Sequence, residues 1–406
     1  MSTNGDIQRL NRRLASAQPS ATYRIMDRVA ERRAQGATII SLCAGEPDFD
    51  TPRHVREAAI HAIEHGHTRY TQVAGVRSLR DAVAAKFRRE NGLDVTWQDT
   101  LVCNGGKHVI YNALAATLNQ GDEVIVPAPY WVSYPEMVQL CGGESRIVTC
   151  DADTGFKLTP ELLAAAITPR TRWLILNSPS NPTGAVYSRE ELHALAQVLL
   201  AHPHVLILAD DIYEHLIFDN QAFHTLAQVE PRLVARTLTM NGVSKAYAMT
   251  GWRIGFATGP RWLLAAMEKL QGQQTSGASS ISQQAALAAL DGPKDFIRES
   301  RVAFQSRRDL MVALLNATPG LECVSPAGAF YAFASCAGLI GRTSAGGRVL
   351  HTDEDVAHAL LDEADVAVVH GSAFGLGPYI RIAYALDEVS LRKACEAIRS
   401  FCTRLR

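Results

Sequence analysis

The chain has 406 residues, of which 47% are hydrophobic and 20% charged, as is typical of a folded protein with room for two domains. Forty basic and forty-one acidic side chains leave a net charge of −1, which gives no electrostatic reason to expect nucleic acid or an anionic membrane as a partner. The N-terminus is polar and basic, and no apolar run is long enough to cross a bilayer, so we predict a cytoplasmic protein.

Short apolar, β-branched runs alternate with helical patterns between residues 100 and 259. The predicted strands are 100–104, 123–127, 146–150, 173–177, 205–209, 236–240 and 254–259. Helical patterns such as 108–118 and 189–202 lie between them. This alternation predicts an α/β fold with a mostly parallel sheet flanked by helices on both faces.

The later part of the chain has a different pattern, with charged helical segments at 308–317 and 353–364. A segment rich in Gly and Ser, 335–349, predicts a loop or a hairpin. The eight cysteines include no Cys-x-x-Cys pair, so we expect small core residues in a reducing compartment rather than a zinc site of that type.

Several polar residues close or follow predicted strands. They are Asn104, Asn177, Asp210 and the loop that carries Lys245. Because sites in parallel α/β sheets form at the carboxyl ends of the strands, we expect these residues to converge on one pocket.

The segment 244–255, SKAYAMTGWRIG, carries the strongest chemical signal. It is too apolar for a surface loop, so Lys245 is expected to be partly buried, where desolvation lowers the pKa of its amine and makes it nucleophilic. Ser244 and Arg253 add a hydroxyl and a guanidinium beside it. This combination suits an enzyme that holds a phosphorylated aldehyde as a Schiff base.

Together with motifs elsewhere, this segment resembles the lysine motif of class I aminotransferases of fold type I, which depend on pyridoxal phosphate. The likeness is greatest to bacterial aspartate aminotransferases of the subgroup found in thermophiles and rhizobia, and it runs from about Leu14 to the C-terminus. The other motifs, in the family's order, are PSAT (19–22), AGEPDFDTP (44–52), NGGK (104–107), PAPYWVSYPEM (127–137), NSPSNPTGA (177–185), ADDIYEHL (209–216) and YIRIAYA (379–385).

The resemblance implies a large domain that binds pyridoxal 5'-phosphate, residues 52–290. It also implies a smaller α+β domain formed by both chain ends, residues 1–51 and 291–406. Tyr70 resembles the tyrosine that reaches the cofactor phosphate from the neighbouring subunit. A homodimer with shared active sites is therefore expected.

The resemblance also assigns catalytic roles. Lys245 would hold the cofactor and transfer the proton, Asp210 would pair with the pyridine nitrogen, and Tyr213 would bind the phenolate oxygen. Asp211 competes with Asp210 for its role, and the family pattern favours the first Asp. The acidic residues here, with His215, could also form a metal site, but the likeness makes this improbable and we predict no metal.

The remaining expected cofactor contacts come from several loops. Gly105, Gly106 and Lys107 open a helix whose first amides can bind phosphate. Ser244 and Arg253 would bind the same phosphate, and Asn181 the phenolate oxygen. Trp131 would stack on the ring, although a tryptophan in an ordinary core is the alternative.

Arg381 alternates with apolar residues on a probable strand, where a buried guanidinium needs an anionic partner. The resemblance makes that partner the substrate α-carboxylate, and a structural ion pair is the alternative. Gly45 and Thr22 are also expected to contact substrate, as are Trp131 and Asn181. Lys107 is the candidate for the second carboxylate.

The expected reaction converts L-aspartate and 2-oxoglutarate to oxaloacetate and L-glutamate, so the partners are amino and 2-oxo acids. Prephenate or an aromatic amino acid is the alternative substrate, alone or beside aspartate. The residues at 23–26, Tyr-Arg-Ile-Met, are bulkier than the small aliphatic residues usual in relatives, which could shift specificity.

A non-catalytic regulator that senses pyridoxal phosphate is a further alternative. Regulators related to this family carry a DNA-binding extension, whereas few residues precede the matched region here, so the sequence favours an enzyme.

Overall fold

The structure is a computed structural model and describes residues 11, 13–14, 17 and 19–406. The predicted absence of a secretory leader concerns the first 20 residues, most of which lie outside the described part. Within the described residues, no helix is long and apolar enough to cross a membrane.

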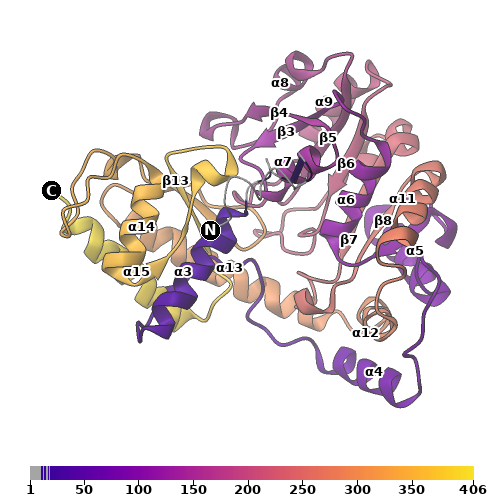
Figure 1. Cartoon of the computed structure of the whole chain (residues 1–406), viewed down its shortest axis with the longest axis horizontal. Coiled ribbons are helices and arrows are strands. Elements are labelled where there is room, and N and C mark those ends of the chain that lie inside the picture. The colour runs from indigo at the N-terminus through magenta and orange to yellow at the C-terminus, as the bar shows by residue number, and fades with distance from the viewer. Residues whose placement is uncertain (1–10, 12, 15–16, 18) are drawn as a thin grey trace.

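A seven-stranded sheet forms the centre of the larger unit, in the order β2-β8-β7-β6-β5-β3-β4 (Figure 1). All seven predicted strands are present. They are β2 (Thr100–Cys103), β3 (Glu123–Ala128), β4 (Glu144–Thr149), β5 (Thr171–Asn177), β6 (Leu206–Asp210), β7 (Thr237–Gly242) and β8 (Gly255–Thr258). The pairs among β4, β3, β5, β6 and β7 are parallel, which confirms the mostly parallel α/β fold.

The exception is β8, which pairs antiparallel with both β7 and β2. Two consecutive parallel strands need a crossover connection, usually through a helix, to bring the chain back to the same end of the sheet. Two consecutive antiparallel strands can be joined by a loop at one end of the sheet. The segment from Val243 to Ile254 makes this connection. It leaves the carboxyl end of β7 and carries Lys245.

Helices cover both faces of the sheet because successive residues of each strand point to opposite sides. On β3, Val124 and Val126 pack with α6, α7 and α11, whereas Ile125 packs with α8 and α9. The helices of this unit are α4 (Arg53–Glu64), α5 (Arg77–Asn91), α6 (Gly106–Thr117), α7 (Ser133–Leu140), α8 (Pro160–Ala166), α9 (Arg189–Leu200), α10 (Leu226–Val229), α11 (Arg261–Gln274) and α12 (Ser280–Asp291).

All eight cysteines are buried and free, as predicted for core residues.

The smaller unit contains an antiparallel sheet in the order β12-β13-β10-β9 and a short parallel pair, β1 with β11. Its strands are β1 (Ile40–Ser41), β9 (Glu322–Cys323), β10 (Tyr331–Ser335), β11 (Val366–Ala367), β12 (Val369–His370) and β13 (Tyr379–Ala383). Its helices are α3 (Ala21–Ala34), α13 (Asp295–Asn316), α14 (Asp353–Ala364) and α15 (Glu388–Thr403). Short 3₁₀ helices connect elements of both units at Trp97–Asp99, Ala152–Thr154, Pro231–Arg236, Thr250–Trp252, Ala337–Leu339 and Gly371–Phe374.

The β1–β11 pair joins the two ends of the chain, with Ile40 opposite Val366. In Figure 1 the early helix α3 accordingly lies among the late helices α13, α14 and α15. Helix α13 links the units, since Ile297 in its first turn packs in the core around α4, α5 and α12, whereas Phe304 packs in the core of the smaller unit. We propose that the domain boundaries fall at residues 51–52 and 290–291, on either side of these connections.

Candidate active site

A cavity of about 570 Å³ opens where the carboxyl ends of the parallel strands face the smaller unit and α3. Most of the predicted site residues line it, although they are far apart in the sequence. They are Thr22, Gly45, Gly106, Lys107, Trp131, Asn181, Asp210, Tyr213, Ser244, Lys245, Arg253 and Arg381. Its volume lies within the range usual for small-molecule sites.

The register of three neighbouring strands sets the floor of the cavity. Asn177 at the end of β5 lies opposite Asp210 at the end of β6, and Asp210 lies opposite Met240 on β7. The Asn177 side chain also donates to the Asp210 carbonyl oxygen over 2.9 Å. The loops that follow these strands therefore leave the sheet side by side.

Lys245 points into the cavity from the loop after β7. Its Nζ donates to the carbonyl oxygen of Gly45 over 2.5 Å. Burial lowers the pKa of the Lys245 ammonium to about 8, against the opposing effect of Glu46. At mildly alkaline pH a substantial fraction of this amine is therefore unprotonated and nucleophilic.

Asp210 is 3% exposed and lines the cavity, whereas Asp211 is equally buried but is not part of the lining. The Tyr134 hydroxyl donates to Asp210 Oδ2 over 2.5 Å. Burial raises the pKa of the Asp210 carboxyl to about 6, and the hydrogen bond from Tyr134 limits the rise. A cation beside Asp210 would favour its ionised form further.

Tyr213 and Tyr331 meet at the cavity wall, with their hydroxyl oxygens 2.9 Å apart. Both lie in the pocket lining and are nearly fully buried. A Cβ atom on Gly45 would lie 2.7 Å from the Tyr331 hydroxyl, so a side chain at position 45 would displace this tyrosine. The small residue at position 45 thus keeps its backbone next to the cavity.

The N-terminus of α6 and Arg253 form a cationic end of the cavity. Gly105 caps the helix with a φ of 87°, and a Cβ atom there would lie 2.4 Å from Arg253 Nη2. Glycine therefore allows the guanidinium to lie against the first turn of α6. Ser244 and Lys107 line the same cavity, and the Lys107 ammonium lies 4.9 Å from the centre of the Trp131 ring. First-turn amides, a hydroxyl and two cations suit an anion such as phosphate.

Arg381 is 3% exposed and reaches the cavity from β13 in the smaller unit. Its guanidinium donates to the Cys43 carbonyl oxygen over 2.6 Å and to Asn181 Oδ1 over 3.2 Å. Its Nε has no hydrogen-bond partner among the described residues, and no carboxylate of that part forms an ion pair with it. A buried guanidinium of this kind still has the capacity to bind a carboxylate.

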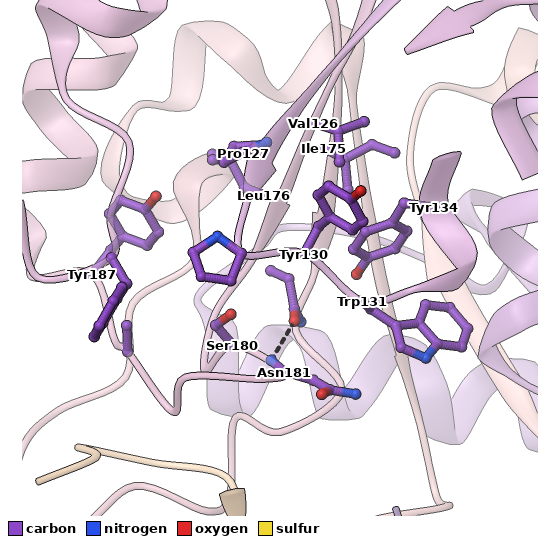
Figure 2. Close-up of a pocket in the computed structure, with 14 residues that line it drawn as sticks. Val126, Pro127, Tyr130, Trp131, Tyr134, Ile175, Leu176, Ser180, Asn181 and Tyr187 are labelled. Carbon is purple, nitrogen blue, oxygen red and sulfur yellow. Dashed lines mark hydrogen bonds between the residues drawn. The ribbon is translucent and has the colours of Figure 1, made fainter. Parts of the chain in front are cut away.

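A second, much smaller cavity of about 20 Å³ is lined by Tyr130, Trp131 and Asn181 among others, and Figure 2 shows these residues. The Asn181 backbone N–H donates to Asn177 Oδ1 over 2.9 Å at its edge. This volume is enough for about one water molecule, because a bound water needs roughly 10–15 Å³. We regard it as a packing feature of the wall rather than a second binding site.

Tyr70 and Gly105 are not part of the lining. Tyr70 is 98% exposed on the segment that follows α4. Helix α4 also exposes Ile60 and Ile63, each by 55%. Within one chain, Tyr70 takes no part in the cavity.

Sequence reasoning assigned no role to two tyrosines that contact predicted site residues. Tyr134 lies three residues after Trp131, in the first turn of α7. Its position so close in sequence to a predicted site residue was only a weak indication that it also contributes to the site. Tyr331 lies on β10 in the smaller unit, and nothing in its local sequence indicated the contact with Tyr213.

Comparison with known proteins gives consistent matches over the whole length. The family described as aminotransferase class I and II matches residues 37–398. A probable aspartate/prephenate aminotransferase from Rhizobium leguminosarum bv. phaseoli is 56% identical over 96% of this chain and 97% of its own length. The crystal structure of the aspartate aminotransferase from Rhizobium meliloti has a TM-score of 0.96 and 52% identity, covering 98% of this chain and 99% of that one. The aspartate aminotransferase from Thermus thermophilus with maleate has a TM-score of 0.90 and 44% identity, covering 97% and 99%.

The low pKa of Lys245 predicts selective labelling of the ligand-free chain. Because this amine loses its proton near pH 8, its reaction with an amine-specific reagent should rise with a midpoint near pH 8. An unperturbed lysine would require a pH of about 10.4. Labelling at each pH, followed by peptide mass spectrometry, measures the midpoint, with the exposed Lys269 as reference in the same digest. A midpoint above about 10 would show that Lys245 is an ordinary lysine.

Proposed function

The chain belongs to the class I and II aminotransferase family, and from this premise we propose that it transfers the amino group of L-aspartate to 2-oxoglutarate. The products are oxaloacetate and L-glutamate, and the cofactor is pyridoxal 5'-phosphate. The observation that carries the proposal is that one cavity is lined by the Lys245 amine together with three further cations, Arg381, Lys107 and Arg253.

The residues of the cavity fit this cofactor. Its phosphate would bind at the N-terminus of α6, where Gly105 leaves room for Arg253 and where Ser244 supplies a hydroxyl. Asp210 would pair with the ring nitrogen, and Lys245 would hold the cofactor through its unprotonated amine. Trp131, Asn181 and Tyr213 would contact the ring and its phenolate oxygen. The bound cofactor supplies an electron sink for the substrate α-carbon.

The chain's own residues would then orient the substrate and move one proton. Arg381 would hold the α-carboxylate with its free donor capacity, close to Asn181 and the Gly45 backbone. Lys245 Nζ would take the proton from the substrate α-carbon. Its pKa of about 8 suits this task because proton transfer is efficient when the pKa of the base lies near the working pH.

A dicarboxylate is favoured because the cavity has cations at both ends. Lys107 would bind the second carboxylate, and Thr22 on α3 lines the same cavity. The Thermus relative has been solved with maleate, which is a dicarboxylate. Relatives named aspartate or aspartate/prephenate aminotransferase match nearly all of this chain.

Prephenate is the second candidate, because it also has two carboxylates but adds a ring. Tyr23 and Met26 line the mouth of the cavity and are 61% and 39% exposed. These side chains offer apolar contact to a ring, which aspartate lacks. A panel of amino donors distinguishes the two candidates. Each donor is mixed with the enzyme, and the half-reaction is followed by the absorbance of the bound cofactor. The panel contains aspartate, glutamate, alanine, phenylalanine and the amino acid formed from prephenate.

The active enzyme would be a homodimer with shared sites in the cytoplasm. Tyr70, Ile60 and Ile63 are large side chains that a single chain leaves exposed, and burial against a second copy would remove their apolar surface from water. The eight free, buried cysteines suit a reducing compartment. Tyr70 would reach the phosphate of the partner's site.

Lys107→Ala should reduce kcat/KM for aspartate and 2-oxoglutarate much more than for alanine or phenylalanine, which have no second carboxylate. Because Lys107 is exposed in the single chain, the expected loss is about 1–2 kcal/mol, or roughly tenfold. Steady-state kinetics with both substrate classes measure the difference. Equal losses for acidic and neutral substrates would mean that Lys107 serves only the phosphate.

Asp210→Asn should weaken cofactor binding and lower kcat roughly a hundredfold, because the charge beside the ring nitrogen is lost. Asp211→Asn is the matched control. Burial raises the pKa of Asp211 well above its usual range, so the amide resembles the neutral acid and should change activity much less. The reverse order of effects would assign the ring nitrogen to Asp211.

A mixed dimer of one Tyr70→Phe chain and one Lys245→Ala chain tests the shared site. If Tyr70 serves its partner, one of the two sites keeps both side chains and the dimer should retain about half of the wild-type activity. If Tyr70 serves its own chain, neither site is complete. Purification with two different affinity tags isolates the mixed species, and each homodimer provides the reference.

A further inference from the structure

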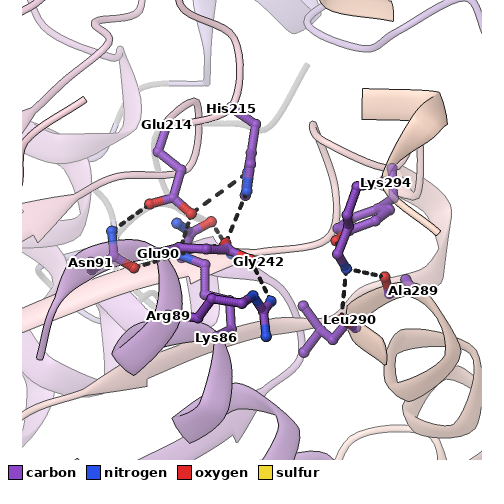
Figure 3. Close-up of polar contacts among 12 residues, drawn as sticks. Lys86, Arg89, Glu90, Asn91, Glu214, His215, Gly242, Ala289, Leu290 and Lys294 are labelled. Carbon is purple, nitrogen blue, oxygen red and sulfur yellow. Dashed lines mark hydrogen bonds and ion pairs between the residues drawn. The ribbon is translucent and has the colours of Figure 1, made fainter. Parts of the chain in front are cut away.

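A buried polar cluster that the proposed chemistry does not use joins α5 to the turn after β6. It consists of Lys86 and Asn91 on α5 and Glu214 just beyond β6, which are 1%, 1% and 6% exposed (Figure 3). Lys86 lies among apolar neighbours on its helix, such as Val83 and Phe87. Three polar groups at such positions are costly to bury, so their arrangement requires a reason.

The three side chains satisfy one another. The Lys86 ammonium pairs with Glu214 Oε1 and donates to Asn91 Oδ1 over 2.7 Å. The Asn91 amide donates to Glu214 Oε2 over 2.7 Å, which closes the triangle. This arrangement fixes the Glu214 carboxylate from two sides and leaves it little freedom to rotate.

Glu214 belongs to the short turn that carries two of the proposed catalytic side chains. Its backbone N–H donates to the Asp211 carbonyl oxygen over 3.0 Å, and the Asp211 N–H donates to Met240 on β7 over 3.0 Å. Asp210 and Tyr213 leave this segment toward the cavity, whereas Glu214 leaves it toward α5. Any movement of Glu214 would therefore be transmitted to both cavity residues through at most four residues of backbone.

The surrounding charges balance without a metal ion. Glu90 lies 3.7 Å from the Lys86 ammonium and 3.1 Å from His215 Nε2, and Arg89 pairs with its other oxygen. Burial alone would raise the pKa of Glu90, but His215 and Lys86 outweigh it and hold the pKa at about 2. Glu90, Glu214 and His215 have a spacing that a metal could use. However, the Lys86 ammonium already provides the cation between the two carboxylates.

We propose that Lys86, Asn91 and Glu214 are positioning residues, which hold the 210–214 segment so that Asp210 and Tyr213 face the cofactor site. The inference rests on the proposed function for the roles of those two side chains. It adds three residues that touch neither substrate nor cofactor but determine the geometry of two groups that do.

The test compares Glu214→Gln and Lys86→Met with a matched control, Glu123→Gln. Glu123 is 5% exposed and also makes charged and neutral hydrogen bonds, to Arg170 and Thr168, but it lies at the opposite end of the sheet. Each purified holoenzyme is assayed for melting temperature, affinity for pyridoxal phosphate, the pH midpoint of the bound cofactor's visible absorbance, and kcat/KM.

All three variants should melt at a lower temperature than the wild type. Only the two cluster variants should also bind pyridoxal phosphate more weakly, shift the pH midpoint and lose about tenfold or more in kcat/KM, because small misplacements of catalytic groups are costly. Cluster variants that match Glu123→Gln in these three measurements would overturn the proposal. A wild-type protein without a cofactor spectrum or transamination would instead contradict the proposed function.

The double variant Lys86→Met/Glu214→Met separates positioning from stability. Removing both charges leaves no unpaired ion in the interior, so the melting temperature should recover at least part of the loss seen in Lys86→Met. If the cluster positions the turn, the shifted midpoint and the low kcat/KM should persist. Recovery of these measurements together with the melting temperature would show that the cluster contributes only to folding, and would overturn the inference.

Discussion

The register of β5, β6 and β7 is the constraint on which the rest of the site depends. Asn177 and Asp210, the last residues of β5 and β6, lie side by side with Met240 on β7, which continues to Gly242. Backbone pairing fixes this alignment, and the carboxyl ends of parallel strands must then open onto a common edge. The loop after β5 brings Asn181 to that edge, and the loop after β7 brings Lys245. A shift of one residue in either pair would turn their side chains to the other face.

The charge distribution of the cavity differs from that of the whole chain. The net charge is only −1, yet Lys107, Lys245, Arg253 and Arg381 all line one cavity. Facing them are Asp210, whose ionisation burial disfavours, and Glu46 near the entrance. Such a surplus of positive charge suits ligands with several negative groups, as a phosphorylated cofactor and a dicarboxylate together would be. A global charge count conceals this local asymmetry.

The region around Arg381 joins the two units of the fold. Arg381 comes from β13, where it lies opposite Phe333 on β10 and Val369 on β12. Its guanidinium extends from this sheet to Asn181 in the larger unit and to the Cys43 carbonyl near the early end of the chain. A carboxylate bound there would contact residues from three separate segments. Ligand binding would therefore favour one relative arrangement of the units, because only that arrangement assembles the contacts.

The sequence alone determined the fold class and the chemical character of the site, because strand and helix periodicity and the residues around Lys245 are local properties of the chain. The predicted strands are present, and the expected side chains, other than Gly105 and Tyr70, line one cavity. The antiparallel direction of β8 and the contacts of Tyr134 and Tyr331 depended on tertiary structure. So did the Lys86–Glu214 pair, which joins positions 128 residues apart. Such contacts depend on strand order, register and helix packing, which arise from cooperation between distant segments and leave no periodic signal in either one.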